Sequence, residues 1–140
     1  GELAGRAGLH YCIEPLSRDQ TSVVNTLDEA LAIVNTAALP GLKTMLDTSS
    51  AGATESEALP ALIDRVWPSG ELVHVQLNDR NRRGPGQGED RFAPILAALQ
   101  RQGYGGWLAM EPFDYVPDGP GCAAYSIGYV RGLIEAATKT

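Results

Sequence analysis

The chain has 140 residues, of which 44% are hydrophobic and 20% are charged, and its formal net charge is −6 at pH 7. This composition fits one globular domain with a sizeable core, so we take residues 1–140 as a single domain or a half-barrel fragment. The negative charge argues against nucleic acid and anionic membrane surfaces as partners, and no apolar segment approaches the roughly 18 residues of a membrane span.

The number of cysteines indicates the redox environment of the protein. Cys12 lies in a predicted strand and Cys122 before the last predicted helix. Two cysteines are too few for a disulfide scaffold and indicate a reducing environment. We therefore expect a cytoplasmic protein.

Four short apolar runs that end in polar residues alternate with helical patterns. The runs predict strands at Leu9–Glu14, Leu42–Asp47, Leu72–Asp79 and Trp107–Glu111. Apolar residues at helical spacing predict helices over 27–34, 59–66, 92–99 and 127–137. Thr26 with Glu29, and Thr54 with Glu57, have the capping-box spacing and predict where the first two helices begin. The predicted order is βαβαβαβα.

This alternation predicts a parallel sheet covered by helices, in one of two architectures. A small doubly wound sheet could stand alone, whereas half of an eight-stranded barrel would leave two open edges. Three predicted strands finish with a carboxylate, at Glu14, Asp47 and Glu111, and the third carries Gln76 near its end. In a barrel these side chains converge at one face, where like charges raise one another's pKa unless a divalent cation binds.

Taken singly, these residues have plainer interpretations. An acid at a strand end is more often a helix cap, and Asp47 is followed by Thr48, Ser49 and Ser50. His74 alone is more often a hydrogen-bonded core residue than a ligand. The G-P-G-Q-G run at 84–88 lacks the lysine of a P-loop and is typical of a turn. The joint pattern in four successive units favours a functional site.

Four segments resemble a known family. They are I-E-P-L-S-R (13–18), L-D-T (46–48), H-V-Q-L-N-D-R-N-R-R-G-P-G-Q-G (74–88) and G-Y-G-G-W-L-A-M-E-P-F (103–113). They resemble the sugar isomerase/epimerase family with a xylose isomerase-like TIM barrel, which includes ketose 3-epimerases, hydroxypyruvate isomerase and inosose dehydratase. In that family the metal ligands lie on the last four strands. The resemblance implies an α/β fold, a parallel (βα)4 unit that is the C-terminal half of a TIM (β/α)8 barrel.

The resemblance also implies a metal site. Its ligands would be Glu14, Asp47, Gln76 and Glu111. The position of Gln76 is histidine in the ketose 3-epimerases and glutamine in the hydroxypyruvate isomerase-like branch. Four oxygen ligands suit Mn²⁺ or Mg²⁺ better than zinc. The side-chain period of two places His74 on the same face, one layer deeper than the ligands.

Three further positions correspond to substrate-binding positions of the family. Arg82 matches a substrate-contacting arginine, while Gln20 and Ser50 replace a glutamate and a histidine of the 3-epimerases. The implied substrate is a small-molecule carbohydrate or hydroxy-keto acid. Glu14 and Glu111 would then act as the acid and base that move a proton through a cis-enediolate. Epimerisation, aldose-ketose isomerisation and dehydration all remain open.

The sequence fits two other functions less well. The chain could be a non-catalytic fragment or binding subunit that completes a barrel as a homo-oligomer or with a complementing N-terminal half-barrel. A barrel of the endonuclease IV type needs a zinc cluster with more histidines than His10 and His74, and a basic surface. The acidic composition therefore disfavours that nuclease.

Overall fold

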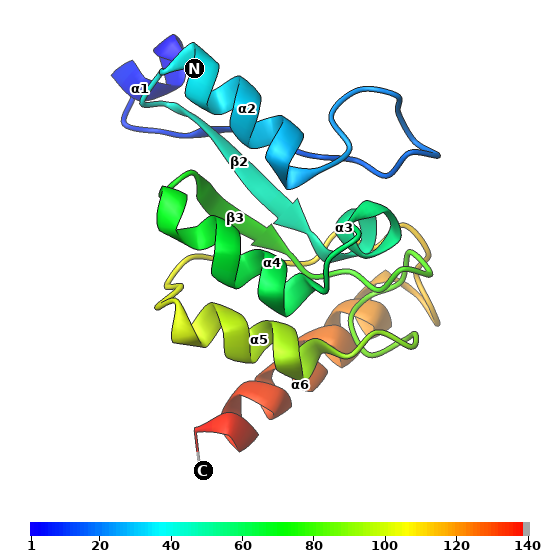
Figure 1. Ribbon diagram of the computed structural model, residues 1–140. Helices are drawn as coiled ribbons and strands as arrows, with labels where there is room; N and C mark the ends of the chain where they lie inside the picture. Colours follow the sequence, from blue (N-terminus) through cyan, green and yellow to red (C-terminus); the bar gives the residue numbers. More distant parts are fainter. Residues whose placement is uncertain (139–140) are drawn as a thin grey trace.

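The computed structural model describes residues 1–138, which form a four-stranded sheet with helices packed on one of its faces (Figure 1). The last two residues of the domain expected over 1–140 lie outside the described part. The strands are β1 (Tyr11–Ile13), β2 (Leu42–Asp47), β3 (Leu72–Gln76) and β4 (Leu108–Ala109). The helices are α1 (Glu2–Arg6), α2 (Leu27–Ala37), α3 (Thr48–Thr54), α4 (Leu59–Val66), α5 (Phe92–Arg101) and α6 (Gly119–Ala137), with a 3-10 turn η1 (Trp67–Ser69).

All three strand pairings are parallel, and the strand order is β1-β2-β3-β4. Each strand therefore lies beside the strand that follows it in the sequence, and at least one helix separates the two along the chain. A doubly wound sheet would instead reverse its strand order at a switch point. The predicted parallel (βα)4 unit of a TIM barrel is confirmed.

The sheet has one covered and one open face. Leu46 and Val75 are paired across β2 and β3 and pack into a core built with residues of α2, α4, α5 and α6. The following pair, Asp47 and Gln76, consequently lies on the opposite face, because side chains alternate along a strand. This open face is the one that lines the inside of a barrel.

One of the two predicted helix starts is wrong. Thr54 with Glu57 does not begin a helix: Thr54 ends α3, and α4 begins at Leu59 after Ala58. Pro60 presets the first turn of α4, and the Glu57 carboxylate instead pairs with Arg65 at 2.9 Å. The capping box of Thr26 and Glu29 on α2 is confirmed.

The last helix is longer than predicted. Asp118 caps α6 by accepting a hydrogen bond from the Gly121 N–H at 2.7 Å, so Cys122 lies inside this helix rather than before it. The predicted apolar stripe is buried at Val130 but exposed at Ile127 and Ile134. In the stretch 1–138, no helix is long and apolar enough to span a bilayer.

Large apolar side chains are exposed at both edges of the sheet. At the β1 edge Tyr11 is 63% exposed, and next to β4 Trp107 is 85% exposed. Neither β1 nor β4 has a second neighbouring strand in the described part of the chain. Uncovered strand edges with apolar side chains favour association with another chain.

We expect these 140 residues, expressed alone, to self-associate through the two open edges. Sedimentation velocity on the wild type and on a Tyr11→Lys/Trp107→Lys double variant measures this, because charge at an edge opposes strand pairing. The double variant should sediment with a smaller mass. A wild type that stays a folded monomer at all concentrations would contradict the expectation.

Candidate metal and substrate site

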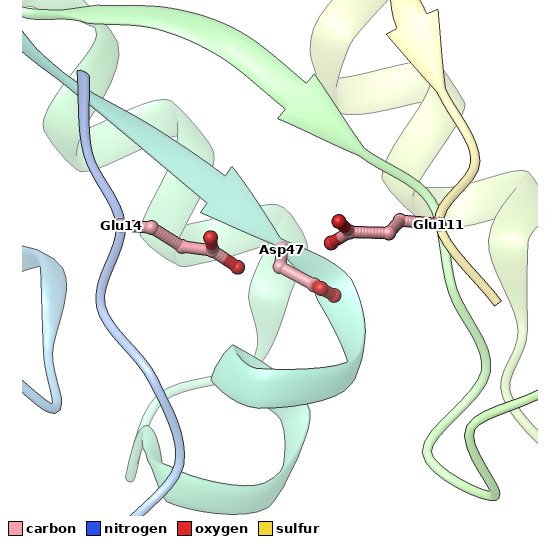
Figure 2. Close-up of side chains that lie close together, drawn as sticks. All are labelled: Glu14, Asp47 and Glu111. Carbon is pink, nitrogen blue, oxygen red and sulfur yellow. The ribbon is translucent and has the colours of Figure 1, made fainter. Parts of the chain in front are cut away.

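Three carboxylates meet at the C-terminal edge of the sheet. Glu14 follows β1 directly, Asp47 is the last residue of β2, and Glu111 lies two residues beyond β4. One oxygen of each lies within 4.8 Å of the others. Figure 2 shows Glu14 and Glu111 reaching toward each other from the two sides, with Asp47 between them. The sequential parallel order of the strands causes this convergence, because all carboxyl ends reach the same edge.

The electrostatics of the cluster are unfavourable without a cation. Burial, and then the charges of Asp47 and Glu111, raise the pKa of Glu14 to about 7. Burial also raises the pKa of Asp47, which is only 4% exposed, against the opposing effect of hydrogen bonds to its carboxylate. Among residues 1–138, no Lys, Arg or His nitrogen forms an ion pair with any of the three. The site therefore concentrates negative charge that the described side chains leave unbalanced.

Asp47 serves as a helix cap and as a member of the cluster. Its Oδ1 accepts a hydrogen bond from the Ser49 N–H at 2.7 Å and thereby caps α3. Each carboxylate oxygen has two acceptor sites, so capping leaves Asp47 able to bind a cation. The two interpretations of this residue are compatible.

Gln76 lies on the same face of the sheet as Asp47, its partner in the β2–β3 pairing. Its Oε1 atom is buried and has no hydrogen-bond partner among residues 1–138. A buried amide oxygen without a partner costs free energy, on the order of 1–3 kcal/mol, unless it binds a donor or an ion. An amide oxygen without a partner, on the face that carries Asp47, fits a hard divalent cation. His74 pairs with Met45 one layer below and is half-buried.

A cavity beside the cluster contains the three predicted substrate-binding residues. It is lined by Glu14, Leu16, Gln20, Asp47, Ser49, Ser50, Asn78, Arg82 and Phe113. Gln20 Oε1 accepts hydrogen bonds from the hydroxyls of Ser17 at 2.8 Å and Ser50 at 3.4 Å. The structure thus brings Gln20 and Ser50 into contact although 30 residues separate them in the sequence.

The three arginines of the loop after β3 have different surroundings. Arg80 pairs with Asp90 at 2.6 Å and Arg83 with Asp114 at 2.7 Å. Arg82 forms no ion pair within residues 1–138, and its guanidinium lies 4.7 Å from the centre of the Phe113 ring. Its backbone has a φ of 68°, in the left-handed region that non-glycine residues rarely adopt. Its guanidinium is thus the one of the three not already paired with a carboxylate.

The Arg82 backbone is held by residues that follow β4. Its carbonyl accepts hydrogen bonds from the N–H groups of Phe113 at 2.9 Å and Asp114 at 3.0 Å. These contacts tie the loop after β3 to the segment that carries Glu111. Phe113 was not predicted as a site residue, because an aromatic residue two positions after an acid is not a distinctive pattern.

Asn78 was also missed in the sequence. It is 1% exposed, and its side chain contacts both Asp47 and the backbone of Glu111. Its position two residues after Gln76 could have indicated a place in the site, because side chains two positions apart along a strand lie on the same face. The predicted strand over 72–79 ends at Gln76, since the Asp79 N–H bonds the Arg83 carbonyl at 3.0 Å and closes a turn.

Comparison with known proteins finds one matching family model and several similar epimerases. The family model for the xylose isomerase-like TIM barrel matches residues 1–132. The chain is 34% identical over 113 residues to the D-psicose 3-epimerase of Agrobacterium fabrum, covering 80% of this chain and 38% of that protein. It is 32% identical over 112 residues to the D-psicose 3-epimerase of Ruminiclostridium cellulolyticum, covering 80% of this chain and 37% of the relative.

A solved structure extends the similarity. The apo crystal structure of 3-keto-D-glucoside 4-epimerase from E. coli superposes with a TM-score of 0.82 at 26% identity. The match covers 93% of this chain and 48% of that one. The chain therefore spans less than half the length of each of these proteins.

The raised pKa of Glu14 predicts a pH dependence of folding stability in the metal-free protein. Its folded-state pKa of about 7 exceeds its ordinary value of 4.5, so the folded state binds this proton more tightly. The resulting stabilisation is fully present below pH 4.5 and is lost as the pH rises through about 7.

Urea unfolding of the full-length protein in chelator, between these pH values, measures the loss. Glu14→Gln should flatten the decline, whereas Glu135→Gln on the exposed face of α6 should not. Parallel stability curves for the wild type and Glu14→Gln would contradict the assignment.

Proposed function

The chain belongs to the xylose isomerase-like TIM barrel family, and on that premise we propose that it carries the active site of a divalent-metal-dependent isomerase or epimerase of sugars or hydroxy-keto acids. The observation that carries the proposal is the convergence of Glu14, Asp47 and Glu111 within 4.8 Å at one edge of the sheet. The relatives named above are epimerases of sugars, which supports this class of reaction.

The metal would be held by the three carboxylates and the Gln76 Oε1 atom. Together they give an all-oxygen set without nitrogen or sulfur, which suits Mn²⁺ or Mg²⁺. A divalent ion would leave the four ligands with a net charge near −1 in place of −3. When bound, it would polarise the carbonyl and adjacent hydroxyl of a hydroxy-ketone and make the intervening C–H more acidic.

Glu14 and Glu111 would transfer the proton. They approach from opposite ends of the sheet and face each other across Asp47 (Figure 2). In this arrangement one carboxylate can remove a proton from a substrate carbon while the other returns one from the opposite side. Return on the opposite face of the same carbon gives epimerisation.

Substrate oxygens would be bound by Arg82, Gln20 and Ser50. The Arg82 guanidinium is exposed beside the cavity and forms no ion pair in the described part of the chain, so its donors can bind a hydroxyl, carboxylate or phosphate. Gln20 and Ser50 are already in contact and present amide and hydroxyl groups to the same cavity. His74 would support the ligand layer from below. Epimerisation is favoured over isomerisation and dehydration by the relatives alone.

The second candidate is a non-catalytic binding subunit. The uncovered sheet edges suit a chain that completes a barrel with a further half or a second copy. The retained carboxylate cluster favours the catalytic proposal, because a purely structural half has no need to bring three acids together.

Glu111→Gln should abolish exchange of the substrate proton while leaving the fold intact. Glutamine keeps the shape and one oxygen that can bind a metal ion, but it cannot carry the proton. Incorporation of solvent deuterium into D-fructose or hydroxypyruvate by the full-length protein measures this. Glu89→Gln, on the exposed loop, is the matched control and should behave as wild type. Deuterium entering at an undiminished rate in Glu111→Gln would refute the assigned role.

Substitutions of Gln76 test the metal site separately from the chemistry. Gln76→His should retain metal and shift preference toward Zn²⁺ or Co²⁺, since imidazole is the softer donor. Gln76→Leu should weaken binding of every divalent ion. Titration of both with Mn²⁺, Mg²⁺ and Zn²⁺, alongside His74→Leu, checks this. Unchanged affinity in Gln76→Leu with reduced affinity in His74→Leu would show that the ligand is His74.

A further inference from the structure

Asn78 joins two of the three converging carboxylate residues through one buried amide. Its Nδ2 donates to Asp47 Oδ2 at 3.1 Å, and its Oδ1 accepts from the Glu111 N–H at 2.8 Å. A backbone N–H can only donate and a carboxylate mainly accepts, so these partners fix which end of the amide faces which residue. A side chain with both a donor and an acceptor is needed to make this bridge.

The backbone of Asn78 is itself fixed to the residue after Asp47. The Thr48 hydroxyl accepts from the Asn78 N–H at 2.9 Å and donates to the Asn78 carbonyl at 2.7 Å. Thr48 is 2% exposed and Asn78 is 1% exposed, so solvent does not compete for these bonds. Thr48 therefore holds the Asn78 backbone beside Asp47, and hydrogen bonds hold the side-chain amide at both of its ends.

Glu111 depends on this bridge because the sheet ends before it. The backbone pairing of β4 ends near Ala109, whose carbonyl accepts from the Leu77 N–H at 2.8 Å. Beyond that point the Asn78 side chain takes the place of a backbone partner for the Glu111 N–H. Glu111 is an exposed residue. Its position relative to Asp47 is thus set through its own backbone N–H.

We propose that Asn78 is a positioning residue that holds Asp47 and Glu111 at the separation required to bind one divalent ion. This inference rests on the proposed function, because it assigns the metal to that cluster. Asn78 does not contact the ion. It acts by orienting one carboxylate directly and by fixing the backbone that carries the other.

Mn²⁺ binding to the full-length protein, followed by titration calorimetry and by electron paramagnetic resonance, tests the proposal. Asn78→Leu keeps the approximate volume and removes both hydrogen bonds, and Asn78→Ala removes them while admitting water. Both should weaken Mn²⁺ binding by about ten- to a hundredfold, the usual effect of losing a residue that orients a metal ligand. Ile63→Ala, in the core between the sheet and the helices, is the control for lost stability and should leave Mn²⁺ affinity unchanged.

Amide hydrogen exchange gives a second readout that needs no metal. The Glu111 N–H should exchange slowly in the wild type and at least tenfold faster in either folded Asn78 variant. If neither variant folds, rapid exchange of the Glu111 N–H in the wild type would by itself overturn the proposal, and slow exchange would support it.

The outcomes separate this inference from the proposed function. Unchanged Mn²⁺ affinity in a folded Asn78 variant, with proton exchange still lost in Glu111→Gln, would refute the role of Asn78 alone. Failure of the wild type to bind Mn²⁺ or Mg²⁺ would refute the metal-dependent function and the role of Asn78 with it.

Discussion

Repulsion among three carboxylates is the constraint on which the rest of the site depends. Glu14, Asp47 and Glu111 come from three strands whose carboxyl ends reach the same edge of the sheet, and their oxygens lie within 4.8 Å of one another. Burial, and then the charges of Asp47 and Glu111, raise the pKa of Glu14 to about 7. A fold that keeps this arrangement accepts a stability cost that a bound cation would remove.

The surrounding residues support the acids without neutralising them. Asp47 accepts hydrogen bonds from the Ser49 N–H and the Asn78 amide, both neutral donors, and the nearby Arg80 and Arg83 are paired with other acids. A lysine or arginine inside the cluster would occupy the place of a divalent ion. Neutral donors orient the carboxylates and leave their charge available. Gln76 Oε1 also has no partner within residues 1–138, on the face that it shares with Asp47, as the ligand role proposed for it requires.

The site lies on the open face of the sheet. Apolar residues on the other face are buried under α2, α4, α5 and α6, whereas the face with Asp47 and Gln76 is the one that a closed barrel would enclose. Relatives are more than twice as long as the part that this chain matches, which covers 38% of the Agrobacterium fabrum epimerase. A closed barrel would place further strands beside the β1 and β4 edges, where Tyr11 and Trp107 are exposed.

The sequence by itself determined the strand-helix alternation, because apolar runs and helical spacing are local patterns, and it placed Glu14, Asp47 and Glu111 at strand ends. The strand pattern also singled out Gln76; family resemblance assigned it a ligand role and added Arg82, Gln20 and Ser50, and these roles stay predictions. Local patterns misplaced the start of α4, since Glu57 forms an ion pair with Arg65 instead of a cap. Only the tertiary structure decided how far β3 extends, which loop arginine lacks a carboxylate partner, and that Asn78 bridges Asp47 and Glu111. The Asn78 bridge rests on contacts with residues more than 30 positions away in the sequence, and no local spacing encodes a hydrogen bond across that separation.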